Sequence, residues 1–350
     1  MFRSIVKPFI FGFLGGIFGI FLLNIVIPKA LFPGASPARQ PSSPPVRVLE
    51  EVTFDIEQAR KTLLTLHQSR LPAAVVPEVS GYALALTSDG LVGIPDTIRE
   101  RIKLKAVSND RRILTLKEAL NAKGKRFYLP ELRIAFYNIA GEQSSSVSPF
   151  ILSAYEQVKV GESLFAFGEG GAVRIHRVIA TYTTATGAAV ESSEDRPPSF
   201  WIDGDPGPGH FLFDYRGQLT GISREHGEAI SAEFMQKALR QYLDNREYRP
   251  TWLGINFMDL NRTAPLPGAP TFGLLLKGAK GRPAVLPKSP AFTAGLKEGD
   301  VLTAFDRRRL DSAIPFQLLL QRYPPGAEVE LGIIRQGQEE TVRVSLGALP

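Results

Sequence analysis

The chain has 350 residues, of which 44% are hydrophobic and 22% are charged, so it is long enough for two globular domains and its composition is not that of a disordered protein. Its net charge of +6 lies almost entirely in residues 1–48, which hold five basic and no acidic residues, and the +1 left for the rest excludes the basic footprint of a nucleic-acid-binding domain. The chain has no cysteine, which excludes disulfides, thiolate catalysis and cysteine-ligated metals.

The first predicted element is an apolar segment from Pro8 to Pro28 that carries no charged residue. Its 21 residues suffice to cross a bilayer as a helix, and we predict an uncleaved, single-pass transmembrane anchor. The short basic stretch 1–7 is expected to stay in the cytoplasm, which places the large C-terminal part outside the cytoplasm, on the other side of this membrane. A cleavable signal peptide is the alternative, but prolines crowd the small residues at 35–38 where cleavage would occur.

Residues 29–48 are rich in proline and serine and are predicted to form an extended linker. Apolar residues then recur at nearly helical spacing from Phe54 to Gln68, which predicts a helix. After Pro72 the pattern changes to short apolar runs between turns, which is typical of an all-β barrel or sandwich and continues to about residue 245. The predicted strands are 81–87, 91–94, 132–137, 163–167, 173–182 and 211–213, and a last helix opens at Ser231 with Phe234, Ala238, Leu239 and Tyr242 on its apolar face.

The stretch 201–223 contains a turn rich in glycine and proline, a short apolar strand, a second turn at 216–217 and another strand. His210 in the first turn has two acidic neighbours, Asp203 and Asp205, a combination that permits a small metal or acid/base cluster. The alternative is a solvated turn in which aspartate and glycine favour the bends. Metal-binding motifs show tighter, repeated spacing, so we predict no metal site and no cofactor.

The C-terminal region, 246–350, contains three features in a fixed order. The first is a turn made of Trp252, Leu253, Gly254 and Ile255. The second is the run Ala-Gly-Leu-Lys-Glu-Gly-Asp at 294–300, and the third is a pair of strands at 329–335 and 340–346. Together they resemble a PDZ domain of the bacterial protease type, a β-sandwich with helices, and we predict such a domain over 246–350.

A PDZ domain binds an extended peptide by adding it as a strand to an exposed sheet edge. We expect the backbone N–H groups of the 252–255 turn to face the terminal carboxylate of the peptide, with Gly254 allowing a close approach. A helix at about 312–323 would close the groove. Three apolar residues of this helix either line the pocket for the last side chain or only build the domain core: Phe316, Leu319 and Leu320.

Landmarks in the middle region extend the resemblance. The sequence pattern of 80–92 is that of a first β-hairpin, and the pattern of 130–135 is that of a strand that begins with an acidic residue. The segment 158–168 has the pattern of a turn that leads into a later strand. With the second half of 201–223, these segments are similar to the HtrA/Deg family of trypsin-like serine proteases. The resemblance implies a mainly β fold with two six-stranded barrels at 49–245, the active site between them, a PDZ domain after them, and a homotrimer.

The positions that carry the catalytic triad in this family hold other residues here. Thr97 falls at the histidine position and Glu131 at the aspartate position, while the serine position holds Pro208 or Gly207 depending on the direction of counting. A triad needs a nucleophile and a base as well as a carboxylate. Pro208 also lacks the backbone N–H that an oxyanion hole uses. We therefore predict a pseudoprotease that has no catalytic residues.

These features predict a membrane-anchored, catalytically inactive HtrA/Deg-like protein that binds exposed peptide C-termini and acts as a scaffold or regulator in envelope protein quality control. Its expected partners are C-terminal peptides of envelope proteins, an active HtrA/Deg relative and the membrane, but not nucleic acid. One alternative is an active serine endopeptidase with a rearranged site that uses Ser199 or Ser223. Another is a purely structural envelope component whose groove is filled by its own unusually long insert at 277–288.

Overall fold

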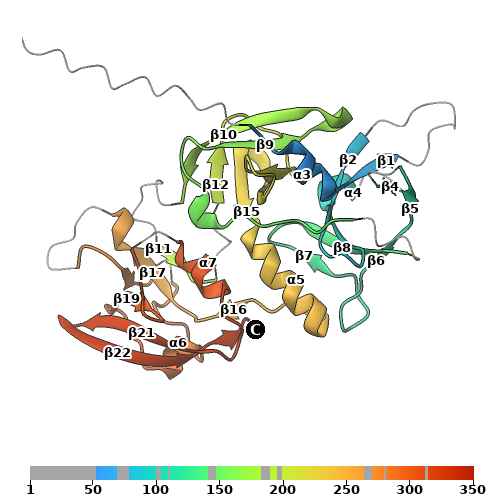
Figure 1. The fold of residues 1–350 in the computed structure, drawn as a ribbon. Coiled ribbons are helices and arrows are strands. Elements are labelled where there is room, and N and C mark those ends of the chain that lie inside the picture. The colour runs from blue at the N-terminus through green and yellow to red at the C-terminus, as the bar shows by residue number, and fades with distance from the viewer. Residues whose placement is uncertain are drawn as a thin grey trace, which may run out of the picture. The chain divides into compact units, whose positions relative to one another are not determined.

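Short apolar runs fold into strands through most of the structure, a computed structural model shown in Figure 1. It describes residues 53–350 except 69–78, 100–103, 109–110, 141–146, 183–189, 195–198, 264–269, 280 and 312–313. The predicted anchor at 8–28 and the linker at 29–48 lie outside the described residues. None of the helices in the described part of the chain has the length and apolar character needed to span a bilayer. All described residues belong to one compact unit, Thr53–Pro350.

The first described segment shows that the helix predicted over 54–68 is wrong in its second half. α3 (Ile56–Lys61) begins at the Asp55 side chain, which accepts a hydrogen bond from Gln58 N at 2.9 Å. β1 (Leu63–Gln68) follows and pairs with a strand on each side. Its leucines have nearly helical spacing but are buried in a strand, because pairing at both edges satisfies the backbone and overrides the local pattern.

The first sheet has eight strands in the order β5-β4-β1-β2-β3-β8-β6, with β7 also paired to β8. The resemblance predicts a six-stranded barrel here, and the count is higher because strands of two and three residues join the longer ones. The short helix α4 (Asp96–Arg99) directly follows β3. The remaining strands are β2 (Val79–Ala85), β3 (Leu91–Pro95), β4 (Leu104–Val107), β5 (Ile113–Leu114), β6 (Leu116–Glu118), β7 (Tyr128–Leu129) and β8 (Ile134–Ile139).

The second sheet closes into a barrel of six strands in the order β10-β12-β15-β14-β13-β9, as the resemblance predicts. Phe165 and Phe213 are fully buried, and their stacked rings lie 5.6 Å apart between centroids. The strands are β9 (Ser163–Phe167), β10 (Val173–Thr181), β12 (Ser199–Ile202), β13 (Phe211–Phe213), β14 (Leu219–Ser223) and β15 (Glu228–Ser231). Single-turn helices are η3 (Tyr155–Gln157), η4 (Glu169–Gly171) and η5 (Glu225–Gly227).

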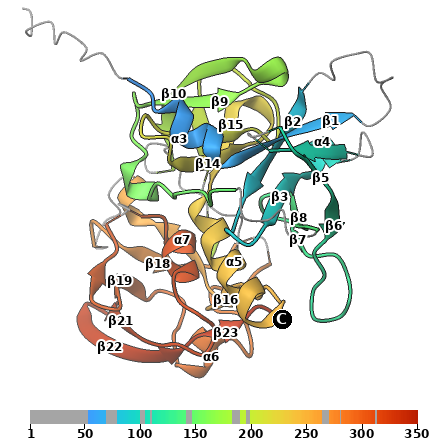
Figure 2. The same cartoon turned by 45° about the vertical axis from the view of Figure 1, so that its right-hand side comes forward.

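The helix α5 (Glu233–Asn245) leads the chain from β15 of the barrel to the C-terminal region (Figure 2). It begins two residues after the predicted start at Ser231, whose hydroxyl accepts a hydrogen bond from Glu233 N at 3.3 Å. Tyr242 packs on the rings of Phe127 and Phe136, with centroids 4.4 and 5.6 Å away. Of the predicted apolar face, Phe234, Ala238 and Tyr242 are buried and Leu239 is partly buried. Met235, which was not predicted, is buried as well.

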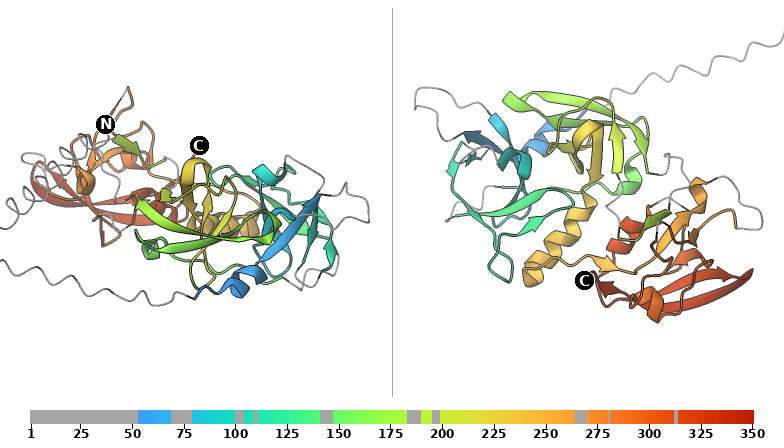
Figure 3. Two further views of the ribbon diagram at one scale, coloured as in Figure 1. Left: turned by 90° about the horizontal axis from the view of Figure 1, so that it is seen from above. Right: turned by 180° about the vertical axis from the view of Figure 1, so that it is seen from behind.

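The third sheet contains the predicted PDZ strands and one strand from outside that region. It has seven strands in the order β11-β17-β18-β19-β21-β22, with β20 paired to β19. β11 (Val190–Ser192) belongs to the loop between β10 and β12, and this yellow-green strand lies among the orange and red ones in both views of Figure 3. Residues 190–192, Val-Glu-Ser, contain no apolar run that would predict a strand.

The other elements of the C-terminal region surround this sheet. β16 (Thr251–Trp252) pairs with β23 (Gly347–Ala348) in a small sheet of its own, and α7 (Phe316–Gln321) occupies the centre of the helix predicted at 312–323. The strands of the large sheet are β17 (Asn256–Asp259), β18 (Leu274–Leu276), β19 (Val301–Phe305), β20 (Arg308–Arg309), β21 (Glu328–Arg335) and β22 (Gln338–Ser345). The remaining helices are α6 (Pro290–Thr293) and η6 (Leu260–Arg262).

Candidate functional site

The structure brings two of the predicted triad positions together. Thr97, at the start of α4, donates a hydrogen bond from Oγ1 to the carbonyl oxygen of Pro208 at 3.2 Å. The packing is tight, since a Cβ added at Gly209 would lie 2.5 Å from Thr97 Oγ1 and 2.8 Å from Pro95 Cβ. This contact joins a hydroxyl to a backbone carbonyl, whereas a triad joins a hydroxyl to an imidazole.

Backbone hydrogen bonds organise the rest of the loop that holds Pro208. Asp205 accepts from Gly207 N at 2.9 Å and from His226 N at 3.1 Å, and the bond from Gly207 N lowers the pKa of this carboxyl. Asp203 accepts from Arg177 N at 2.6 Å. The Asp205 side chain therefore holds turns in place, whereas the Asp203 side chain ties the loop to β10. In the described part of the chain, no group of three His, Cys, Asp or Glu side chains is placed to hold a metal ion.

The two serines of the rearranged-protease alternative also have partners. Ser223 is 1% exposed, donates from Oγ to Gly207 O at 2.6 Å and accepts from His210 N at 2.9 Å. Ser199 donates from Oγ to a carboxylate oxygen of Glu228. The hydroxyls thus contact a carbonyl, a backbone N–H and a carboxylate, groups that do not form a serine–histidine couple.

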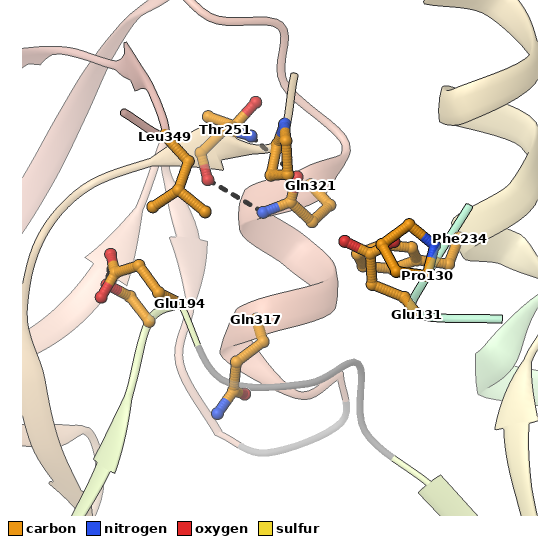
Figure 4. Close-up of a pocket in the computed structure, with 10 residues that line it drawn as sticks. Pro130, Glu131, Glu194, Phe234, Thr251, Gln317, Gln321 and Leu349 are labelled. Atoms are coloured by element: carbon orange, nitrogen blue, oxygen red, sulfur yellow. Dashed lines mark hydrogen bonds between the residues drawn. The ribbon is translucent and has the colours of Figure 1, made fainter. Parts of the chain in front are cut away.

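Glu131, the residue at the aspartate position, lies in the wall of a cavity of about 340 Å³. Its Oε2 is buried without a hydrogen-bond partner, and burial raises the pKa of this carboxyl. In Figure 4, Gln317 and Gln321 extend from α7, with Glu194 on one side of the helix and Glu131 on the other. The lining residues are Pro130, Glu131, Ser193, Glu194, Phe234, Pro250, Thr251, Gln317, Gln321 and Leu349.

The predicted carboxylate-binding turn does bind a carboxylate, but one from this chain. Gly254 N donates to Glu194 Oε1 at 2.8 Å, and Ile255 N donates to Ser193 Oγ at 3.1 Å. Ser193 N in return donates to Ile255 O at 2.9 Å. Gly254 is required here, since its φ is +81° and an added Cβ would lie 2.2 Å from Ser289 Cβ.

The same segment continues as a strand along the sheet edge. β11 runs antiparallel to β17, so that Val190, Glu191 and Ser192 pair with Met258, Phe257 and Asn256. The pairing satisfies the edge of β17 through backbone hydrogen bonds, which is how PDZ domains bind extended peptides. We call residues 190–194 the groove segment.

One side chain anchors the groove segment. Glu191 forms an ion pair with Arg262 at 2.5 Å, with side chains 19% and 11% exposed, and accepts from Gln317 Nε2 at 2.9 Å. Tyr182 donates from its hydroxyl to the same carboxylate at 2.5 Å. Burial and the Glu191 charge raise the pKa of Tyr182, so its hydroxyl stays protonated and able to donate. A half-buried cluster of this kind holds an acidic residue specifically.

Comparisons with known proteins agree with this architecture. The family model for the PDZ domain matches residues 252–346. A probable periplasmic serine endoprotease DegP-like from Hahella chejuensis is 26% identical over 285 residues, which cover 78% of this chain and 56% of that protein. A probable periplasmic serine endoprotease DegP-like from Halomonas elongata is 28% identical over 170 residues, covering 47% and 33%. The chain is similar to HtrA/DegP-like serine proteases and carries a PDZ domain.

Solved structures show the fold of this HtrA/DegP-like chain. The HtrA-type protease AlgW with a decapeptide superposes with a TM-score of 0.51 at 17% identity, covering 84% of this chain and 98% of that one. AlgW with a tripeptide gives a TM-score of 0.52, also at 17% identity, covering 84% and 96%. The predicted family resemblance and the mainly β protease fold followed by a PDZ domain are confirmed. The chain spans about half or less of the length of the curated relatives it matches.

The side of the PDZ helix α7 that faces the groove segment is not the apolar side that was predicted from the sequence. The predicted residues Phe316, Leu319 and Leu320 are all buried, and the Phe316 ring packs edge-on against Phe257 at 5.6 Å between centroids. The residue that donates to the groove segment is Gln317, with bonds to Glu191 and to Ser192 O. A signal existed in the sequence, because glutamines at 317 and 321 mark a second, polar stripe at i and i+4.

The insert 277–288 supports the turn of the PDZ domain from its other side. Asn256 N donates to Ala284 O at 2.8 Å, and Leu286 N donates to Gly254 O at 2.9 Å. The groove edge of β17 pairs instead with the groove segment, so the alternative in which the insert fills the groove is wrong for the described residues.

Proposed function

We propose that this HtrA/DegP-like protein is a catalytically inactive, membrane-anchored member whose PDZ domain binds peptide C-termini. The observation that carries the proposal is the convergence of Gly254 N and Ile255 N on acceptor oxygens at the end of a paired strand. Two N–H groups at this place match the two oxygens of a terminal carboxylate, and the edge of β17 supplies the backbone pairing. The AlgW structures with a decapeptide and a tripeptide support binding of peptides by this fold.

Catalytic inactivity is supported by the residues at the former triad. Thr97 contacts the Pro208 carbonyl, Pro208 has no N–H to offer an oxyanion, and Glu131 lies in the wall of the cavity beside the PDZ helix. Without a nucleophile and a base, binding remains as the function. The protein would then act as a scaffold or regulator in envelope protein quality control, together with an active HtrA/Deg relative.

The setting of this function follows from the relatives and from the sequence. The curated relatives are named periplasmic, and we propose the same side of the inner membrane for 49–350, with the pseudoprotease domain at 49–245 and the PDZ domain at 246–350. The anchor at 8–28 would hold them there. We propose a homotrimer, as the resemblance implies, and C-terminal peptides of envelope proteins as ligands.

The binding proposal is tested by titrating the full chain, in detergent, against fluorescein-labelled peptides from a C-terminal library. Binding should be lost when the terminal carboxylate is amidated, because one hydrogen-bond acceptor and the negative charge disappear. Equal binding of acid and amide would refute a carboxylate site.

The alternative, an active serine endopeptidase, is tested separately. Unfolded casein should remain intact during incubation with the purified protein, and a fluorophosphonate probe should label no serine. A labelled Ser199 or Ser223, with cleavage lost on its replacement by alanine, would establish the enzyme instead.

A further inference from the structure

The groove segment places its atoms as a bound C-terminal peptide would. An added strand runs antiparallel to β17 and ends at the turn 252–255, and residues 190–194 do both. Ser193 N bonds to Ile255 O, which is the backbone bond available to the last residue of a ligand. Ser193 therefore stands at the last position and Glu191 at the third from the end.

The terminal carboxylate is imitated by two side chains. Glu194 Oε1 accepts from Gly254 N at 2.8 Å, and Ser193 Oγ accepts from Ile255 N at 3.1 Å while donating to Glu194 Oε1 at 2.5 Å. A true terminus would present two charged oxygens to the same two N–H groups from a single residue. Its hydrogen bonds would be charge-assisted at both donors, whereas the hydroxyl of Ser193 is a neutral acceptor.

We propose that the groove segment is an internal competitor for the PDZ groove, displaced by C-terminal peptides that carry an acidic residue third from their end. This inference rests on the proposed peptide-binding function and adds its regulation and its ligand class. An incoming ligand must satisfy Arg262 and Gln317, whose partner in the occupied state is the Glu191 carboxylate. A ligand without an acidic group at this position would lose the ion pair with the Arg262 guanidinium, which is only 11% exposed.

The segment is suited to be displaced. It fills the groove with a serine at the last position and leaves the cavity of about 340 Å³ beside Ser193 and Glu194. A ligand whose last residue has a larger side chain can extend toward this cavity and gain contacts that the segment does not make. Because the segment is tethered in the same chain, it competes at a constant effective concentration rather than by free diffusion.

The competition raises the apparent Kd, which equals the intrinsic Kd divided by the fraction of molecules whose groove is open. A segment that occupies the groove about nine-tenths of the time would weaken peptide binding about tenfold. The full chain is titrated with a fluorescein-labelled decapeptide ending Val-Glu-Ser-Phe with a free carboxylate, and with its Val-Gln-Ser-Phe counterpart. Glu57→Gln serves as the matched control, because this exposed glutamate lies on α3 and pairs with Arg60.

The double variant Glu191→Gln/Glu194→Gln is expected to bind the Val-Glu-Ser-Phe peptide about tenfold more tightly than the wild type and the control. If all three proteins bind it equally, the groove accepts peptides but the segment does not compete, which overturns this inference alone. If none of the three binds either peptide, the proposed function itself fails.

The ligand class and the displacement have their own readouts. Arg262→Gln should bind the Val-Glu-Ser-Phe and Val-Gln-Ser-Phe peptides equally. The double variant Glu191→Gln/Glu194→Gln keeps Arg262 and should prefer the Val-Glu-Ser-Phe peptide; equal binding of both peptides by this double variant would overturn the acidic-residue assignment. Hydrogen exchange of the full chain follows the Ser193 amide directly, because this amide donates to Ile255 O at 2.9 Å. Saturating peptide should speed exchange of the Ser193 amide in the wild type, and unchanged protection at saturation would refute displacement.

Discussion

A partly buried lysine of α5, whose ammonium bonds to residues of the PDZ domain, allows a prediction with a definite sign. The Lys237 ammonium donates to the Thr251 hydroxyl, to Gln321 Oε1 at 2.8 Å and to Tyr323 O at 3.1 Å, and burial lowers the pKa of Lys237 to about 7. None of these three partners is a carboxylate. The site therefore solvates a cation with neutral dipoles only, which disfavours its charged form.

The magnitude follows from proton linkage. Between a folded pKa of about 7 and the ordinary value of 10.5, the unfolded chain binds more protons than the folded one, so stability rises with pH over this window. At 1.36 kcal/mol per pH unit, the burial of this charge costs about 4 kcal/mol at pH 7 and about 1 kcal/mol at pH 10. The cost is present in full below the folded pKa and vanishes above the unfolded one.

Lys237→Met removes the charge and leaves the acceptors with other donors. Gln321 Oε1 still accepts from Thr251 N at 2.9 Å, and Tyr323 O still accepts from the Thr251 hydroxyl at 2.5 Å. We expect the variant to be more stable than the wild type by about 2–4 kcal/mol at pH 7, with this advantage shrinking by about 3 kcal/mol at pH 10.

The assay is urea unfolding of residues 53–350, which form one compact unit, followed by circular dichroism at pH 7 and pH 10. Lys123→Met is the matched control, because Lys123 is exposed in the turn after β6 and should show no pH-dependent difference from the wild type. A variant–wild-type difference that stays constant between the two pH values, or grows, would refute the reasoning about the buried charge.

Two further substitutions and one control test the PDZ turn and helix. Gly254→Ala places a Cβ 2.2 Å from Ser289 Cβ at a positive φ and should abolish peptide binding and lower the melting temperature. Gly299→Ala has a similar positive φ but no atom within 4 Å, so it should cost only about 1 kcal/mol; equal losses in the two variants would contradict the steric argument. Phe316→Ala should destabilise by about 3–5 kcal/mol in urea unfolding, and a loss below 1 kcal/mol would show that Phe316 is not a core residue.

Local sequence patterns and short motifs were enough to predict several elements of this fold. The turn 252–255 and the run 294–300 indicated the PDZ domain. Both are short motifs of consecutive residues, a tight glycine turn and a particular order of apolar and small residues, so they can be recognised without knowledge of long-range contacts. The barrel strands at 163–167 and 211–213 were likewise predicted with the observed bounds. That the residues at 97 and 208 are threonine and proline, and not histidine and serine, is also read from the sequence alone.

Only the tertiary structure decided which chain segments meet. Leucines spaced as in a helix became β1 because two later strands pair with it, and Glu131 lies in the wall of the cavity beside α7. The groove segment shows the same limit most clearly. Strand addition to β17 uses the backbone N–H and C=O groups, which nearly every residue has. The residue types of Val190 to Glu194 therefore do not predict pairing with a strand more than sixty residues away. Residue types can specify a groove, but long-range pairing decides what occupies it.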